Sequence, residues 1–147
     1  MTRTRCLAVA LVAASCLAVA SPAQARDMTV PRMEHIWDWF TPRVQDAPDP
    51  PGMRIREGPA YTWWVGLYTN DWVNVRPWAR RRLVVHEFAH YVFDKWQVDS
   101  SPEGSAFLYR KGFTGWTEYA QELWCNKLAS AVSGDPGAIR LMAVWLR

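Results

Sequence analysis

The chain has 147 residues, of which half are hydrophobic and 21% are charged, and its formal net charge is +3. Its length predicts one domain of ordinary size. The modest net charge and the absence of a polybasic tail exclude the strongly basic class of nucleic-acid-binding proteins, so no nucleic acid is expected as a partner.

Residues 1–25 have the pattern of a secretory signal peptide. Two arginines precede a short apolar run over 6–20, and small residues follow up to Ala25. The run is too short for a membrane-spanning helix. We therefore expect cleavage near Ala25, export to the secreted, periplasmic or cell-wall space, and no stable membrane span afterwards. A lipid anchor on Cys16 is the alternative.

Residues 26–54 are predicted to form an N-terminal helix and then a proline-rich linker or arm. Thr29 followed by an early proline is typical of a helix start, and Pro42 limits the helix end. The proline-rich stretch 47–52 cannot sustain a helix or an interior strand. A lid or an inhibitory arm is the alternative role for this part of the chain.

Residues 55–147 are predicted to form a small α+β domain. Aromatic and β-branched residues over 55–76 predict a strand pair with a turn at 69–71. Residues 78–96 lack a helix breaker and are apolar on most sides, which indicates a central helix. The stretch 99–115, rich in Ser, Pro and Gly, is expected to be a loop. Two further helices are predicted, over 116–132 and, after an Asp135 cap, up to Trp145.

The most informative motif is His86-Glu87-Phe88-Ala89-His90, the HExxH pattern, inside the predicted central helix. Residues four apart lie on the same helix face one turn apart, so His86 and His90 can bind one cation. Glu87 lies about 100° around the helix, beside such a cation, where a carboxylate can move a water proton. The motif predicts a hydrolytic zinc site. The alternative is a buried helix whose histidines have ordinary hydrogen-bond partners.

A zinc site of this kind needs a third protein ligand. The candidates are His35, Asp94, Asp99, Glu103, Glu118, Glu122 and Cys125. A metzincin would carry a histidine at position 96, and this residue is Trp. On the predicted helix 116–132, Glu118 and Glu122 share one side with an apolar stripe, where carboxylates need a cationic or hydrogen-bonding partner. A slightly rotated helix with both glutamates at a solvated edge is the alternative.

The two motif helices together resemble those of the gluzincins, the thermolysin-like clan of zinc metallopeptidases. The amino-acid sequences of the two motifs are most similar to those of minimal gluzincins of the lethal-factor type. The resemblance implies a zincin-like fold in which His86, His90 and Glu118 bind Zn2+. It also implies that Glu122 orients a ligand histidine and that Glu87 is the general base and later the acid.

The resemblance further implies a donor to the oxygen on which negative charge develops during hydrolysis. Tyr109 is the first candidate for this catalytic role, with Arg110 and Arg140 as alternatives. In a zincin-like layout the strand over 72–76 would be the edge that pairs with substrate. Cys125 is expected to be a small buried residue, with alternative-ligand chemistry as the other reading.

The expected function is that of an exported zinc-dependent metallopeptidase acting on a peptide or protein substrate. The alternative is a catalytically inactive, zinc-stabilised binding or cell-wall-associated protein on a degenerate peptidase scaffold. Glu87 favours the enzyme, because a structural zinc site needs its ligands but no base. Neither the substrate nor the oligomeric state follows from the sequence.

Overall fold

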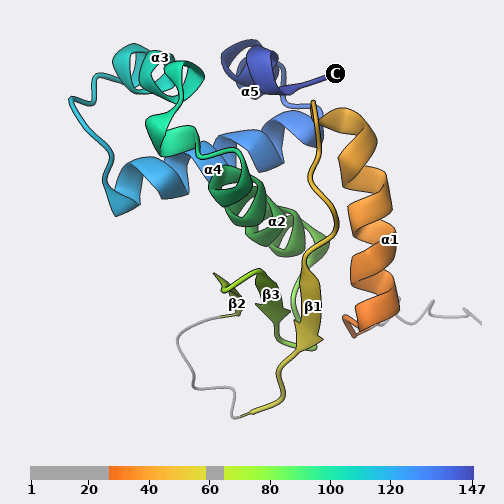
Figure 1. The fold of residues 1–147 in the computed structure, drawn as a ribbon. Helices are drawn as coiled ribbons and strands as arrows, with labels where there is room; N and C mark the ends of the chain where they lie inside the picture. The colour runs from red at the N-terminus through yellow and green to blue at the C-terminus, as the bar shows by residue number, and fades with distance from the viewer. Residues whose placement is uncertain (1–26, 59–64) are drawn as a thin grey trace, which may run out of the picture.

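The computed structural model describes residues 27–58 and 65–147, which form an α+β fold of five α-helices and a three-stranded sheet (Figure 1). The helices are α1 (Val30–Phe40), α2 (Arg81–Lys95), α3 (Pro102–Lys111), α4 (Glu118–Val132) and α5 (Pro136–Met142). The strands are β1 (Gly52–Ile55), β2 (Gly66–Thr69) and β3 (Trp72–Val75). The α+β class predicted from the sequence is confirmed.

Two predicted features fall wholly or partly outside the described residues. The signal peptide over 1–25 is one, and part of the predicted strand pair, residues 59–64, is the other. Among the residues that are described, no helix combines the length and the apolar character needed to cross a membrane.

Helix α2 is the central element, as predicted. The sheet packs along one side of it, α1 packs along another side, and α4 crosses it (Figure 1). Its buried residues are Val84, Val85, Glu87, Phe88, Ala89, Tyr91, Val92 and Phe93. The helix begins at Arg81, later than the predicted residue 78, because Arg80 has an extended backbone (φ −82°, ψ 152°). A helix buried on most sides holds its side chains in fixed positions.

Four of the described helices begin at side chains that cap the first turn, and three of them are α1, α4 and α5. The capping oxygen accepts a backbone N–H three residues on in each case: Thr29 from Arg32 at 3.4 Å, Thr117 from Ala120 at 3.1 Å and Asp135 from Ala138 at 2.6 Å. Such caps satisfy N–H groups that have no partner within the helix. The predicted starts of α1 and α5 are confirmed.

The sheet has the strand order β1-β3-β2. Strands β2 and β3 form the predicted antiparallel hairpin, with Asn70 (φ 49°) and Asp71 (φ 64°) both left-handed as a two-residue hairpin turn requires. Strand β1 was not predicted, and it pairs parallel to β3. Because β3 is therefore the central strand, the expectation that residues 72–76 form a free substrate-pairing edge is wrong.

Helix α3 replaces the loop predicted over 99–115. Ser101 caps it by accepting the Gly104 N–H at 2.9 Å, and Pro102 occupies the first helical position. Gly112 ends the helix in the left-handed conformation (φ 76°). Phe107 is fully buried, so the helix is tied to the core. The Ser, Pro and Gly residues that suggested a loop are the start and stop signals of a short helix.

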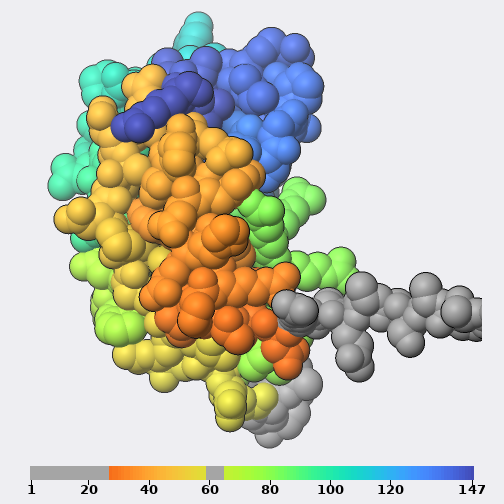
Figure 2. All heavy atoms as spheres, turned by 90° about the vertical axis from the view of Figure 1, so that its right-hand side faces the viewer, coloured from red at the N-terminus to blue at the C-terminus, as the bar shows by residue number. Residues whose placement is uncertain are grey.

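Helix α1 belongs to the same hydrophobic core as α2. The Trp37 ring meets the Phe88 ring edge-on with centroids 5.0 Å apart, and Phe40 is also completely buried. Figure 2 shows α1 lying along one face of the molecule, with the first part of α2 emerging beside it. Within the described residues, α1 is thus a packed layer over α2.

Removing the cap of α3 tests this element. Ser101→Ala leaves the Gly104 N–H without its acceptor, and we expect a loss of about 1 kcal/mol in the free energy of unfolding. Urea unfolding followed by circular dichroism measures it. Ser105→Ala in the same helix keeps the cap and should leave stability nearly unchanged; equal losses in the two variants would contradict the capping role.

Candidate metal centre

Three side chains from two helices converge on one point. The Nε2 atoms of His86 and His90 lie 3.0 Å apart, and each lies 3.1 Å from a carboxylate oxygen of Glu122. The two histidine side chains are 14% and 12% exposed, whereas that of Glu122 is 46% exposed. The group is therefore shielded by protein on the α2 side and open on the α4 side.

The backbone explains the convergence. His86 and His90 are one turn apart on α2, and their rings meet nearly at right angles, at 83°. Helix α4 packs against α2. The buried face of α4 includes Cys125, Ala129 and Val132, and Glu122 lies at the edge of this face, opposite the histidines.

The three atoms fit the ligand set of a zinc ion. Two imidazole nitrogens and one glutamate oxygen are the protein ligands of one class of catalytic zinc site. Metal–ligand distances of about 2.0–2.2 Å in a tetrahedral site put neighbouring ligand atoms about 3.3 Å apart. Here the two Nε2 atoms are 3.0 Å apart and each lies 3.1 Å from a different oxygen of Glu122, and one ligand atom from each residue can be chosen so that all three lie within 4.8 Å of one another. His86, His90 and Glu122 could thus hold a metal ion.

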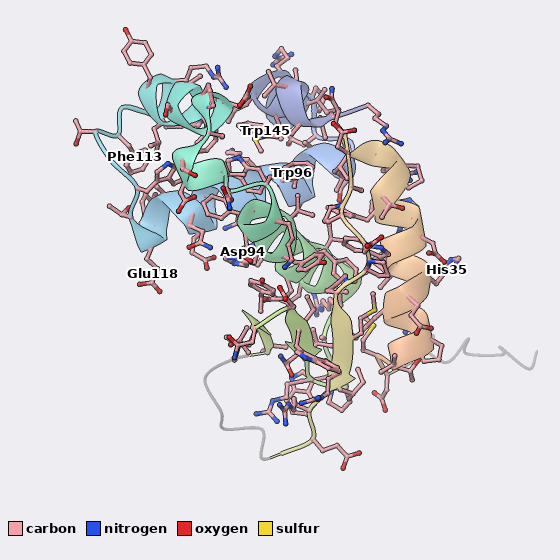
Figure 3. The ribbon with its side chains drawn as sticks, in the orientation of Figure 1. His35, Asp94, Trp96, Phe113, Glu118 and Trp145 are labelled. Atoms are coloured by element: carbon pink, nitrogen blue, oxygen red, sulfur yellow. The ribbon has the colours of Figure 1, made fainter. Side chains whose placement is uncertain are left out.

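The glutamate that lies beside the two histidines is not the one predicted as the third ligand. Glu118 is the first residue of α4, and its exposed side chain lies at the end of that helix, away from the histidines (Figure 3). Glu122, predicted to orient a ligand histidine, is the glutamate whose oxygens lie 3.1 Å from both histidine Nε2 atoms. A helical wheel places both glutamates on one side, but α4 crosses α2 near only one of its turns. The structure thus brings Glu122, and not the predicted ligand Glu118, together with the two histidines.

Other predicted site residues lie elsewhere. Tyr109 is 86% exposed on α3, and Arg110 donates to the Leu141 carbonyl at 3.5 Å, so neither is seen beside the histidines. His35 is exposed on the outer side of α1 (Figure 3). Cys125 is completely buried, as expected, and this burial raises the pKa of its thiol.

Glu87 is a buried carboxylic acid next to the metal ligands. Its side chain belongs to the small set of buried polar groups, at 5% exposure. Burial, together with the negative charge of Glu122, raises its pKa to about 7, against a smaller opposite effect from the Tyr68 backbone. A nearby divalent cation would favour the carboxylate form again. Glu87 is therefore placed to exchange a proton near neutral pH.

Gly66 makes room for Glu87. A Cβ atom at this position of β2 would lie 2.4 Å from Oε1 of Glu87, closer than any real contact. Sequence reasoning did not identify Gly66 as part of the site. The available signal was a glycine inside a predicted strand, which often marks the close approach of another group.

Burial also favours neutral imidazoles. It lowers the pKa of both His86 and His90, and the charge of Glu122 opposes this effect in each. Neutral imidazole is the form that binds metals. The electrostatics of the group thus agree with its ligand geometry.

A cavity of about 400 Å³ opens beside His86 and Glu122. Its other lining residues are Arg80, Arg82, Leu83, Asn126 and Ala129. The volume lies within the range of about 300–1,000 Å³ that is usual for small-molecule pockets. A ligand could therefore reach the histidine and glutamate side chains from this side.

Comparison of the chain with models of protein families, with curated proteins and with solved structures gave no significant match in any of the three. The functional assignment therefore rests on the residues and their geometry.

Metal binding distinguishes the two glutamates. We expect the protein to bind about one Zn2+ per chain, and Glu122→Ala to weaken binding more than about 100-fold, because the loss of an outer hydrogen-bonding partner alone costs 10–100-fold. Competition with a chromophoric chelator measures the affinity. Glu118→Ala, one helical turn away, is the matched control and should bind as the original chain does. The reverse pattern would restore Glu118 as the ligand.

Proposed function

We propose that the protein is an exported zinc-dependent metallopeptidase with a zincin-like fold, in which His86, His90 and Glu122 hold Zn2+ and Glu87 is the general base and acid. The observation that carries the proposal is the meeting of one ligand atom each from His86, His90 and Glu122 within 4.8 Å of one another, with a buried carboxyl group on Glu87. Export rests on the pattern of residues 1–25.

Zn2+ in such a site supplies Lewis acidity and lowers the pKa of water. Glu87 takes the proton of the attacking water and holds it on its carboxyl group. It then delivers this proton to the nitrogen of the peptide bond that breaks. Burial raises the pKa of Glu87 to about 7 in the metal-free chain, and bound Zn2+ would favour the carboxylate form, which is the form that accepts the water proton.

The arrangement of the elements supports a peptide as the substrate. Strand β2 packs on α2 next to Glu87 and borders the sheet, since β3 separates it from β1. Within the described residues the outer edge of β2 has no strand partner. An extended peptide could add to this edge through main-chain hydrogen bonds. We therefore assign to β2 the substrate-pairing role that the sequence had suggested for residues 72–76.

An inactive, zinc-stabilised binding protein is the competing function. It would need His86, His90 and Glu122, but it would not need a carboxylic acid beside them, and burying such a group costs free energy on folding. Glu87, shielded between α2 and Gly66, is therefore the residue that favours the enzyme.

Glu87→Gln separates metal binding from catalysis. The amide keeps the shape of the side chain but cannot take a proton, so we expect cleavage of a mixed peptide pool to fall about 10²–10⁴-fold or more. The zinc content should stay near one per chain. Tyr109→Phe, which changes an exposed ring on α3, is the control and should retain activity. Undiminished turnover by Glu87→Gln would refute the mechanism, and a large loss in Tyr109→Phe would restore the sequence-based donor.

Gly66→Ala should act on Glu87 through space. The added methyl group would overlap Oε1 of Glu87 and force the carboxyl group to move. We expect peptide cleavage to fall at least about tenfold while zinc binding persists, because misplacing a catalytic group is costly. Gly115→Ala is the matched control, since a Cβ there meets nothing within 4 Å. Equal activity of the two variants would show that Glu87 does not depend on Gly66.

A further inference from the structure

We propose that the cavity beside His86 and Glu122 binds a carboxylate group of the substrate, next to the bond that is cleaved. This inference rests on the proposed peptidase function and adds a substrate class to it. The carboxylate can belong to an Asp or Glu side chain or to the end of a peptide chain. The charges and the walls of the cavity carry the argument.

Two arginines supply the positive charge. Arg80 and Arg82 line the cavity, and both are exposed. Within residues 27–58 and 65–147, neither guanidinium group takes part in a salt bridge or side-chain hydrogen bond. Unpaired guanidinium groups bind carboxylates through charge-assisted, often paired hydrogen bonds. The cavity thus offers donors whose natural partner is a carboxylate.

The arginine between these two, Arg81, contacts an aromatic ring and not the cavity. Its guanidinium group lies over the Trp39 ring, 4.0 Å from the centroid, and it does not line this cavity. Trp39 also carries Arg43 on its ring, at 4.2 Å. The run of three arginines is therefore divided: one is held by an aromatic side chain and two border the cavity. This division provides a control of equal charge.

The walls suit a short acidic side chain. Leu83 and Ala129 are apolar and can pack against methylene groups, and Asn126 adds an amide that can donate to an oxygen. The acidic residue that lines the cavity is Glu122. In the proposed function Glu122 binds the metal ion, which offsets its negative charge. The positive charges of Arg80 and Arg82 then determine the electrostatic potential in the rest of the cavity.

Binding is tested first, on the Glu87→Gln variant loaded with zinc, so that no turnover is needed. The probes are fluorescein-labelled, amidated alanine hexapeptides with one central Glu or Gln, and fluorescence anisotropy gives the Kd. We expect the Glu peptide to bind about tenfold more tightly. A hexapeptide of alanine alone, with a free or an amidated C-terminus, tests the terminal carboxylate as the other source.

The arginines are then changed in the same background. Arg80→Gln/Arg82→Gln should reduce the ratio of the two Kd values to about 1, whereas Arg81→Gln should keep it. Circular dichroism and zinc content confirm that each variant is folded and loaded. A preference that survives the double substitution, or that disappears equally in Arg81→Gln, would overturn the assignment of the cavity.

Cleavage by the unaltered chain separates this inference from the proposed function. We expect mass spectrometry to locate the cleaved bond beside Glu, with kcat/KM about tenfold higher for the Glu peptide than for the Gln peptide. Cleavage of both peptides at equal rates with equal Kd would overturn the carboxylate pocket and keep the peptidase. Preferential binding of the Glu peptide without any cleavage would support the pocket and contradict the peptidase.

Discussion

The approach of α4 to α2 is the constraint on which the site depends. It places two imidazole nitrogens 3.0 Å apart and each of them 3.1 Å from one of the two oxygens of Glu122, in a partly buried position. Without a metal ion the three side chains can pair with one another, because each neutral imidazole has one N–H that can donate to an oxygen of Glu122. A single divalent cation can satisfy all three. The packing of α4 on α2 therefore determines which side chains the proposed metal centre contains.

The same helix gives its neighbouring residues different environments. His86 and His90 face α4 and an open cavity, whereas Glu87, about 100° around the helix, faces the sheet. The sheet approaches closely because Gly66 has no side chain. The result is a buried carboxyl group with a pKa of about 7, next to two histidines of which His86 lines a cavity. The helical geometry of α2 thus directs the side chain of Glu87 to one side and those of His86 and His90 to another.

Local signals predicted much of this structure. The HExxH spacing, the Thr29 and Asp135 caps and the hairpin turn depend on neighbours in sequence, and the structure contains them. Glu118 and Glu122 could not be separated in this way, because both follow the helical repeat and only the point where α4 crosses α2 selects between them. Strand β1 depends on pairing with a distant segment. Helix α3 is different: its cap at Ser101 and its end at Gly112 were readable from the sequence.

An aromatic cluster packs α4 against α2. No disulfide contributes to this packing, because Cys125 is the lone cysteine of the described residues. Trp124 of α4 meets Phe93 of α2 at 5.3 Å, and Trp145 also packs edge-on against Trp124, at 5.3 Å between ring centroids. Rings of this size bury much apolar area, and their edge-to-face contacts favour one orientation. Trp124 lies two residues beyond Glu122, so the cluster fixes the turn of α4 that carries the third ligand. Trp124 and Trp145 thus belong to the hydrophobic core, and by fixing α4 they also position the candidate metal centre.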